Sequence, residues 1–377
     1  MILRHAAHTT VYAGEHAWSL LRKEISGPAV VVADAGVAVD TGALPVIRLD
    51  AGNVDLRTVT SLAGQLAAHA PKTVVGVGGG SVLDMVKLAC LVHTDPRMPD
   101  VLAAWGRRAG VITLPTGRES GPCRIFVPTT IGTGVEVSPV ACVSVDGHKR
   151  IVTGDRLRPD KAVLDPACTA SLPEHLLREG VLEALLRIIG PVAGSPHVGG
   201  LPDSEARALA GHLVAMGDRI AAGETGARIR LQAAMASAAT HTGWALAGRD
   251  PFSAKHWYLA NELSTVLGLR KMTATAMLLP AVWSRIEAGD RRYGDPAQLA
   301  MAWRWVDDSA PVAGLRALLR RWRIGGGAQP SSADLGDAAR RAVTSWGGRL
   351  PMLAGLTAAE IEALYAEAAR EVLPCST

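Results

Sequence analysis

The sequence has few of the features that mark a membrane, disulfide-bonded or nucleic-acid-binding protein. Only 4% of its 377 residues are aromatic, and they are not interleaved with basic residues in a way that indicates base stacking. The five cysteines form no C-x-x-C pair and no regular spacing, which favours a reducing compartment. No uncharged apolar run reaches 18 residues in length, and no continuous apolar leader opens the chain. We therefore expect a soluble, cytoplasmic protein that binds neither nucleic acid nor membrane.

What the chain does have is an ordinary globular balance. Hydrophobic residues make up 48% and charged residues 20%, with a formal net charge of +4 spread along the sequence. This composition excludes intrinsic disorder. The length is sufficient for two or three domains with a large buried core.

Residues 73–93 predict a phosphate-binding turn. A β-branched run at 73–77 is followed by three glycines and a serine, and then by apolar residues at helical spacing. Glycines let a ligand approach the backbone, and the start of a helix offers free N–H groups and a positive dipole. We therefore expect the turn to bind a nucleotide-type cofactor through Gly78, Gly79, Gly80 and Ser81.

Up to residue 166 the pattern alternates short apolar strands with helices. Strands are predicted at 29–33, 73–77, 124–128 and 141–145, and helices at 56–70 and 81–93. Such alternation indicates an α/β fold with a parallel, doubly wound, Rossmann-like sheet. Ligands of such sheets bind at the C-terminal ends of the strands.

After residue 166 the pattern becomes helical. We expect an N-terminal dinucleotide-binding α/β domain at 1–166, an all-helical substrate domain at 167–377, and a cleft between them. Capping signals include Ser332 with Asp334, and Thr357 with Glu360. The predicted helices are 174–189, 203–222, 226–247, 257–266, 273–287, 295–305, 312–322, 332–345 and 358–372.

Three motifs follow one another in the first half. Residues 78–87 read GGGSVLDMVK, residues 128–138 read PTTIGTGVEVS, and residues 148–166 contain a lysine followed by PDKAVLDP. These blocks resemble segments of the iron-containing alcohol dehydrogenases, a superfamily that also includes glycerol dehydrogenases, maleylacetate reductases and dehydroquinate synthases. With the helical second half, the resemblance covers nearly the whole chain.

The resemblance implies a set of cofactor-binding residues. The glycine turn would hold a pyrophosphate, and the motif residues Asp84, Thr129, Thr130, Thr133 and Lys149 would complete the site. Asp34 ends an early strand, where a carboxylate accepts bonds from a ribose and repels a 2′-phosphate, so we expect NAD rather than NADP.

Simpler interpretations of three of these residues stay open. Asp34 can merely start a turn, Asp84 can be a charge favoured by the helix dipole, and Lys87 can be a solvated helix residue.

The metal site of the family is altered in this chain. The family holds a divalent ion with an aspartate, a histidine four residues later and two further histidines. Here the first pair reads Glu183 and Arg187, and Trp257 and Lys271 stand at the later histidine positions. Guanidinium has no lone pair to offer a metal. At most Glu183 and His256 remain as metal ligands, so we expect the protein to work without the family metal. His241 is interpreted as an ordinary helix residue.

The substituted cations suggest their own chemistry. Arg187 and Lys271 can stabilise a developing alkoxide or bind a substrate carboxylate. Glu183 would balance their charge, and His256 or a water held by Asn261 would relay a proton. The opposing interpretation is a salt bridge that fills an inactive site.

Three functions are open at this point. The first is an NAD-linked oxidoreductase that transfers a hydride between nicotinamide and an alcohol or hydroxy acid, with a peptide or natural-product intermediate among the substrate classes. The second is a catalytically silent NAD-binding homologue that partners an active paralogue. The third is a cyclase similar to dehydroquinate synthase, which Glu183 favours. Members of the family that the chain resembles often pair through an N-terminal edge strand, so the resemblance implies a homodimer, with a paralogue as the alternative partner.

Overall fold

The computed structural model describes residues 9–371 except 51, 53, 118–120, 327, 328 and 349. The chain divides into two compact units. The α/β unit comprises the described part of Ala6–Pro173 together with Thr225–Thr242, and the helical unit comprises Glu174–Glu224 with the described part of Gly243–Thr377. This division differs from the expected boundary at residue 166, because residues 167–173 and 225–242 join the α/β unit.

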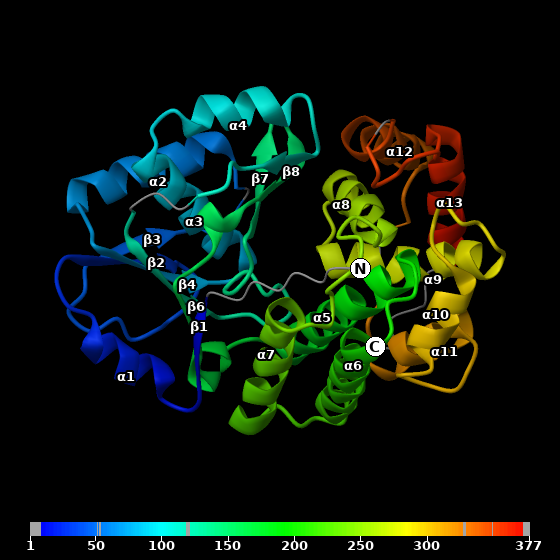
Figure 1. Cartoon of the computed structure of the whole chain (residues 1–377), viewed down its shortest axis with the longest axis horizontal. Coiled ribbons are helices and arrows are strands. Elements are labelled where there is room, and N and C mark those ends of the chain that lie inside the picture. Colours follow the sequence, from blue (N-terminus) through cyan, green and yellow to red (C-terminus); the bar gives the residue numbers. More distant parts are fainter. Residues whose placement is uncertain are drawn as a thin grey trace. The chain divides into compact units, whose positions relative to one another are not determined.

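A six-stranded parallel sheet forms the centre of the α/β unit (Figure 1). Its strand order is β1-β9-β6-β4-β2-β3, and every pairing is parallel. The predicted parallel α/β fold is thereby confirmed. The strands are β1 (Thr10–Ala13), β2 (Ala29–Asp34), β3 (Val46–Leu49), β4 (Thr73–Gly78), β6 (Cys123–Pro128) and β9 (Lys161–Leu164).

Alternate residues of the strands face two different apolar cores. Val30 and Val32 of β2 pack in one core with α2 and α3, whereas Val31 and Ala33 pack in the other with Trp18 of α1. This period of two places helices on both faces of the sheet. The helices of this unit are α1 (Ala17–Glu24), α2 (Leu56–His69), α3 (Gly80–Thr94), α4 (Met98–Gly106) and α7 (Ala227–Thr242), with short 3-10 turns at Asp155–Leu157 and Pro166–Thr169.

The strand predicted at 141–145 exists but lies outside the parallel sheet. It is β7 (Val140–Val145), which pairs antiparallel with β8 (His148–Thr153), and β8 also pairs with β5 (Val111–Thr113). The expectation that it continues the parallel sheet is wrong. Asp146 and Gly147 both have positive φ, and such a two-residue turn closes a tight hairpin.

The helical unit contains all but one of the helices predicted after residue 173, with shifted ends. The helix predicted at 226–247 ends at Thr242 and belongs to the α/β unit, and residue 372 lies outside the described part of the chain. The helices of this unit are α5 (Glu174–Gly194), α6 (Gly200–Ala221), α8 (Lys255–Leu267), α9 (Lys271–Glu287), α10 (Pro296–Trp303), α11 (Pro311–Arg321), α12 (Ser332–Trp346) and α13 (Ala358–Arg370).

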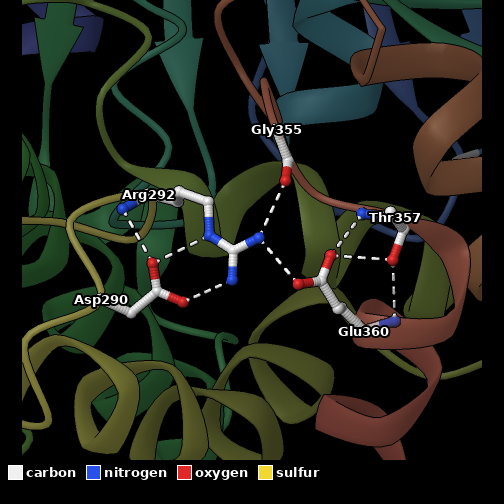
Figure 2. Close-up of polar contacts among 5 residues, drawn as sticks. All are labelled: Asp290, Arg292, Gly355, Thr357 and Glu360. Carbon is white, nitrogen blue, oxygen red and sulfur yellow. Dashed lines mark hydrogen bonds and ion pairs between the residues drawn. The ribbon is translucent and has the colours of Figure 1, made fainter.

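Two capping boxes fix the last two helices. Thr357 and Glu360 form the predicted box at α13, whereas the cap of α12 is Ser331 with Asp334 and not Ser332. Figure 2 shows how Glu360 also binds Arg292, which lies between α9 and α10 and donates to Asp290 and to the Gly355 carbonyl. These bonds fasten the segment before α10 to the start of α13.

No helix in the described ranges combines the length and the apolarity that crossing a bilayer requires.

Candidate functional site

The glycine turn lies between β4 and α3, at the C-terminal end of a central strand. Gly79 is the N-cap of α3, and no side chain caps the helix there. A Cβ on Gly78 would lie 2.7 Å from Cβ of Val82, and one on Gly80 would lie 3.1 Å from Thr133. A side chain at position 78 would therefore force Val82 to move, and one at position 80 would crowd Thr133. The open helix start, with the first amides of Gly80 and Ser81, fits the pyrophosphate of a dinucleotide.

The structure brings the predicted threonines onto this turn. The backbone N–H of Thr129 donates to the Gly78 carbonyl over 3.0 Å. The methyl group of Thr130 lies 3.2 Å from where a Cβ of Gly79 would stand. We call residues 129–134 the threonine loop. The threonine loop therefore packs directly against the glycine turn, and the predicted contacts of its hydroxyls with a cofactor stay predictions.

Asp34 and Lys149 lie on other elements. Asp34 ends β2, the strand beside β4, and its Oδ1 accepts the Gly36 N–H over 2.9 Å. The aspartate therefore starts a turn, and its contact with a ribose stays a prediction. Lys149 is on β8 opposite Ser144, in the three-stranded sheet. Lys149 thus lies on a different sheet from the glycine turn, and its contact with a cofactor stays a prediction.

Asp84 and Lys87 are buried in the α/β unit. Lys87 is fully buried, which contradicts the solvated alternative, and its Nζ donates to the carbonyls of Ser138 (2.7 Å) and Val140 (2.8 Å). Burial lowers the pKa of Lys87 to about 7, against the opposing charges of Asp84 and Glu136. Asp84 Oδ2 accepts the Cys142 N–H over 3.0 Å. Both side chains tie α3 to β7, and the cofactor role of Asp84 stays a prediction.

In the helical unit, three predicted residues form one charged cluster. Glu183 on α5 accepts from Lys271 Nζ at 3.3 Å, and Arg187 Nη2 lies 3.8 Å from the same carboxylate oxygen. The first pair joins two helices, and the second is an i,i+4 pair on α5. In this cluster, one carboxylate faces two cationic side chains.

An aromatic ring supports the lysine of this cluster. Lys271 Nζ lies 4.4 Å from the ring centroid of Trp257, within the range of a cation–π interaction. Trp257 stands at one of the altered histidine positions, and its role as a platform was not predicted from the sequence. The side chain of Lys271 is 38% exposed, so a ligand can still reach its ammonium group.

His256 packs against the ring of Trp257. Its ring centroid is 4.4 Å from that of Trp257, and a Cβ on Gly190 of α5 would lie 2.6 Å from its Cε1. Burial, reinforced by the charge of Lys271, lowers the pKa of His256 to about 3, so the ring is neutral near pH 7. Its buried Nε2 has no hydrogen-bond partner within the described ranges. Asn261 is also buried, on α8 four residues after Trp257. The proton-relay roles of both residues stay predictions.

The residues present do not fit the divalent ion that the resemblance implied. Within the part of the chain that the structure describes, no three histidine, cysteine, aspartate or glutamate side chains converge as metal ligands. The carboxylate of Glu183 is instead paired with Arg187 and Lys271. An ammonium and a guanidinium repel a cation and have no lone pair to give it.

Taken together, the fold and these sites define a class of protein. It is a doubly wound α/β protein with a glycine turn at a helix start, followed by a helical unit that carries polar, chemistry-bearing side chains. Comparison with known proteins narrows this class. Residues 9–166 match the family model of the iron-containing alcohol dehydrogenases.

Individual relatives agree with that match. Long-chain-alcohol dehydrogenase 1 of Geobacillus thermodenitrificans is 38% identical over 118 residues, 31% of this chain and 28% of the relative. Phosphonoacetaldehyde reductase of Streptomyces viridochromogenes is 34% identical over 145 residues, 37% of this chain and 36% of the relative. The NADPH-dependent aldehyde reductase YqhD of Escherichia coli is 26% identical over 213 residues, 56% of this chain and 53% of the relative.

The likeness of fold extends further than the likeness of sequence. The crystal structure of Escherichia coli YqhD has a TM-score of 0.80 and 20% identity, over 97% of this chain and 98% of that chain. The match of the family model over residues 9–166, together with this likeness of fold, confirms the resemblance to the iron-containing alcohol dehydrogenases. The sequence matches are partial, since the chain spans about a third of the length of the first two relatives.

Proposed function

We propose that the protein is an NAD-linked oxidoreductase that transfers a hydride between nicotinamide and an alcohol or hydroxy acid, with side-chain cations in place of the family metal. One observation carries the proposal. Glu183, on a helix of the second unit, is shared by Lys271 at 3.3 Å and Arg187 at 3.8 Å. The kinship with alcohol and aldehyde dehydrogenases gives the reaction class.

The chemistry follows from the charges of this cluster. Hydride transfer to a carbonyl leaves negative charge on oxygen, and a fixed cation in a partly buried site stabilises that charge. Lys271 is oriented by Glu183 and by the face of Trp257, so little reorganisation is needed. Arg187 presents a planar fork that suits a carboxylate, which favours hydroxy-acid or oxo-acid substrates.

The cofactor proposal depends on the α/β unit. The uncapped start of α3 and the closely packed glycines before it support a bound pyrophosphate. Bound NAD would supply the hydride acceptor. Asp34 favours NAD over NADP by charge repulsion of a 2′-phosphate, although one relative is named for its use of NADPH.

The test is a direct assay of binding and turnover. Purified protein is titrated with NADH and NADPH by fluorescence, and then assayed by NADH absorbance against alcohols, aldehydes, hydroxy acids and oxo acids, with and without a chelator. We expect NADH binding and chelator-resistant turnover, highest with substrates that carry a carboxylate. Turnover that requires added Zn²⁺ or Fe²⁺ contradicts the cation proposal.

A second function has an observation in its favour. The two cations and Glu183 already satisfy one another, as expected of a silent homologue that binds NAD and partners an active paralogue. Tight NADH binding without turnover of any substrate in the panel supports this alternative. Release of inorganic phosphate from a sugar-type phosphate would indicate a cyclase instead.

We also infer a homodimer. Strand β1 lies at the edge of the six-stranded sheet and pairs only with β9 among the described strands. Such an open edge can pair with a second chain. Sedimentation velocity is expected to give twice the chain mass of 39.3 kDa, and a monomer contradicts the inference.

A further inference from the structure

Helix α7 (Ala227–Thr242) lies in the α/β unit, although it follows two helices of the other unit in sequence. It was expected to form part of the helical domain. Two side chains of α7, those of Ser237 and His241, contact the threonine loop of the α/β unit.

Ser237 makes the first of these contacts. Its Oγ accepts the backbone N–H of Gly132 over 3.2 Å, and the serine side chain is almost fully buried. Leaving a buried amide without an acceptor costs more than an ordinary hydrogen bond contributes to stability. The hydroxyl therefore holds the middle of the threonine loop in place.

His241 makes the second contact, one helical turn later. Its Nε2 lies 3.3 Å from the carbonyl oxygen of Thr133, and since a carbonyl can only accept, the ring nitrogen donates. A Cβ added to Gly134 would overlap Cδ2 of His241. The ring thus packs directly on the loop backbone, and glycine with its positive φ is needed beneath it.

The far end of α7 is fastened independently of the loop. Arg230 donates to the carbonyl of Thr169 through Nη1 and to that of Leu172 through Nη2, the latter over 3.1 Å. Arg230 is itself buried. The helix therefore presents Ser237 and His241 from a fixed base, and the threonine loop is the part that these contacts hold.

The loop in turn contacts the glycine turn. Thr129 donates to Gly78, and the methyl groups of Thr130 and Thr133 lie 3.2 and 3.1 Å from where the Cβ atoms of Gly79 and Gly80 would stand. A shift of the loop by a few tenths of an ångström would change the width of this surface. The contacts therefore form a chain from α7 through the threonine loop to the proposed pyrophosphate site.

We propose that Ser237 and His241 are positioning residues for the cofactor site, which fix the threonine loop against the glycine turn so that a dinucleotide meets a preformed surface. This inference rests on the proposed cofactor function. It gives His241, which the sequence suggested was an ordinary helix residue, a specific task.

The test combines a cofactor-independent readout with a cofactor-dependent one. Hydrogen exchange of amides 129–134 is measured without cofactor in the parent, Ser237→Ala and His241→Ala, and the dissociation constant for NADH is then measured in each. Loss of one hydrogen bond should speed loop exchange and weaken NADH binding by about threefold to tenfold in each variant. His241→Gln, which keeps a donor, should recover part of the loss.

Met235 provides the matched control. It lies on the same helix and is 43% exposed, so Met235→Ala should change neither readout. In Ser237→Ala and His241→Ala, the KM for NADH should rise while kcat at saturating NADH changes less than twofold.

The two possible failures are distinguishable. Unchanged exchange of residues 129–134 in both alanine variants overturns the positioning role, whatever happens to NADH binding. A parent protein that binds neither NADH nor NADPH overturns the proposed function and the cofactor part of this inference together. Faster exchange with an unchanged NADH dissociation constant also overturns the inference, because the loop would then be anchored without mattering to the cofactor.

Discussion

The two units resemble the iron-containing alcohol dehydrogenases to different degrees. The α/β unit carries motifs that a family model matches over residues 9–166, whereas the helical unit shares its fold with a solved structure and has an arginine and a lysine where the resemblance predicts metal ligands. The difference follows from what each site is made of. A pyrophosphate site uses backbone N–H groups and the absence of Cβ atoms, so few substitutions are tolerated. A metal site uses side-chain lone pairs, which can be replaced while the helices still pack.

The largest expected effect tests how much the buried hydrogen bonds of the α/β unit contribute to its stability. Lys87→Met removes a buried ammonium from the carbonyls of Ser138 and Val140 and from the facing Asp84. Because those groups stay buried without it, we expect the free energy of unfolding to fall by about 3 kcal/mol. Chemical denaturation measures this, and a loss below about 1 kcal/mol would show that the lysine is dispensable.

A second test concerns the glycine turn itself. Gly78→Ala places a Cβ 2.7 Å from Val82, and such overpacking typically costs about 1–3 kcal/mol. We expect the variant to bind NADH at least tenfold more weakly than the parent. Gly64→Ala is the control, since Gly64 lies within α2 with open space around it, and it should stabilise the protein by about 0.5–1 kcal/mol. Equal NADH binding by Gly78→Ala would remove the steric argument.

A third test addresses the helical unit. Arg187→Ala and Lys271→Ala should each lower kcat/KM by at least tenfold, roughly 1.4 kcal/mol, with NADH binding unchanged. Arg270→Ala is the neighbouring control, because Arg270 pairs with Glu179 and not with Glu183, and it should retain activity within about twofold. If both cluster variants turn over like the parent, the cations have no catalytic role.

The smallest expected effect concerns Glu360, which lies away from both sites. It tests whether this carboxyl makes the stability of the helical unit depend on pH. Bonds from Thr357 and Arg292 lower the pKa of the exposed Glu360 to about 2, below its ordinary value of 4.5 (Figure 2). A depressed carboxyl pKa stabilises the folded state above pH 4.5, and that stability is lost as the pH falls toward 2. Glu360→Gln should therefore lose less stability than the parent between pH 5 and 2.5, followed by thermal unfolding. An identical pH response would contradict the assignment.

The sequence predicted most of the fold but less of its long-range assembly. The runs at β2, β4 and β6 and the helices after residue 173 were recognisable because burial and helical spacing are local patterns. The β7–β8 hairpin was missed although Asp146-Gly147 is a hairpin signal. The packing of α7 in the α/β unit was not predictable, because it depends on hydrogen bonds from Arg230 to the carbonyls of Thr169 and Leu172, some 60 residues away in sequence.

The candidate site divides in the same way. The Glu183–Arg187 pair was predictable from its i,i+4 spacing. Lys271 was predicted to lie near them because it stands at a metal-ligand position of the family pattern. The Trp257 platform, the burial of His256 and the buried bonds of Lys87 depend on packing between distant elements, which spacing along one helix does not reveal. The interdomain cleft and the cofactor contacts of Asp34 and Lys149 stay predictions.

The most direct test of the account is the metal content of catalytically active protein, measured by elemental mass spectrometry beside its NADH turnover before and after chelation. The substitution of cations for the ion predicts far less than one Zn or Fe per chain and turnover that survives the chelator. A stoichiometric transition metal whose removal abolishes turnover would contradict it.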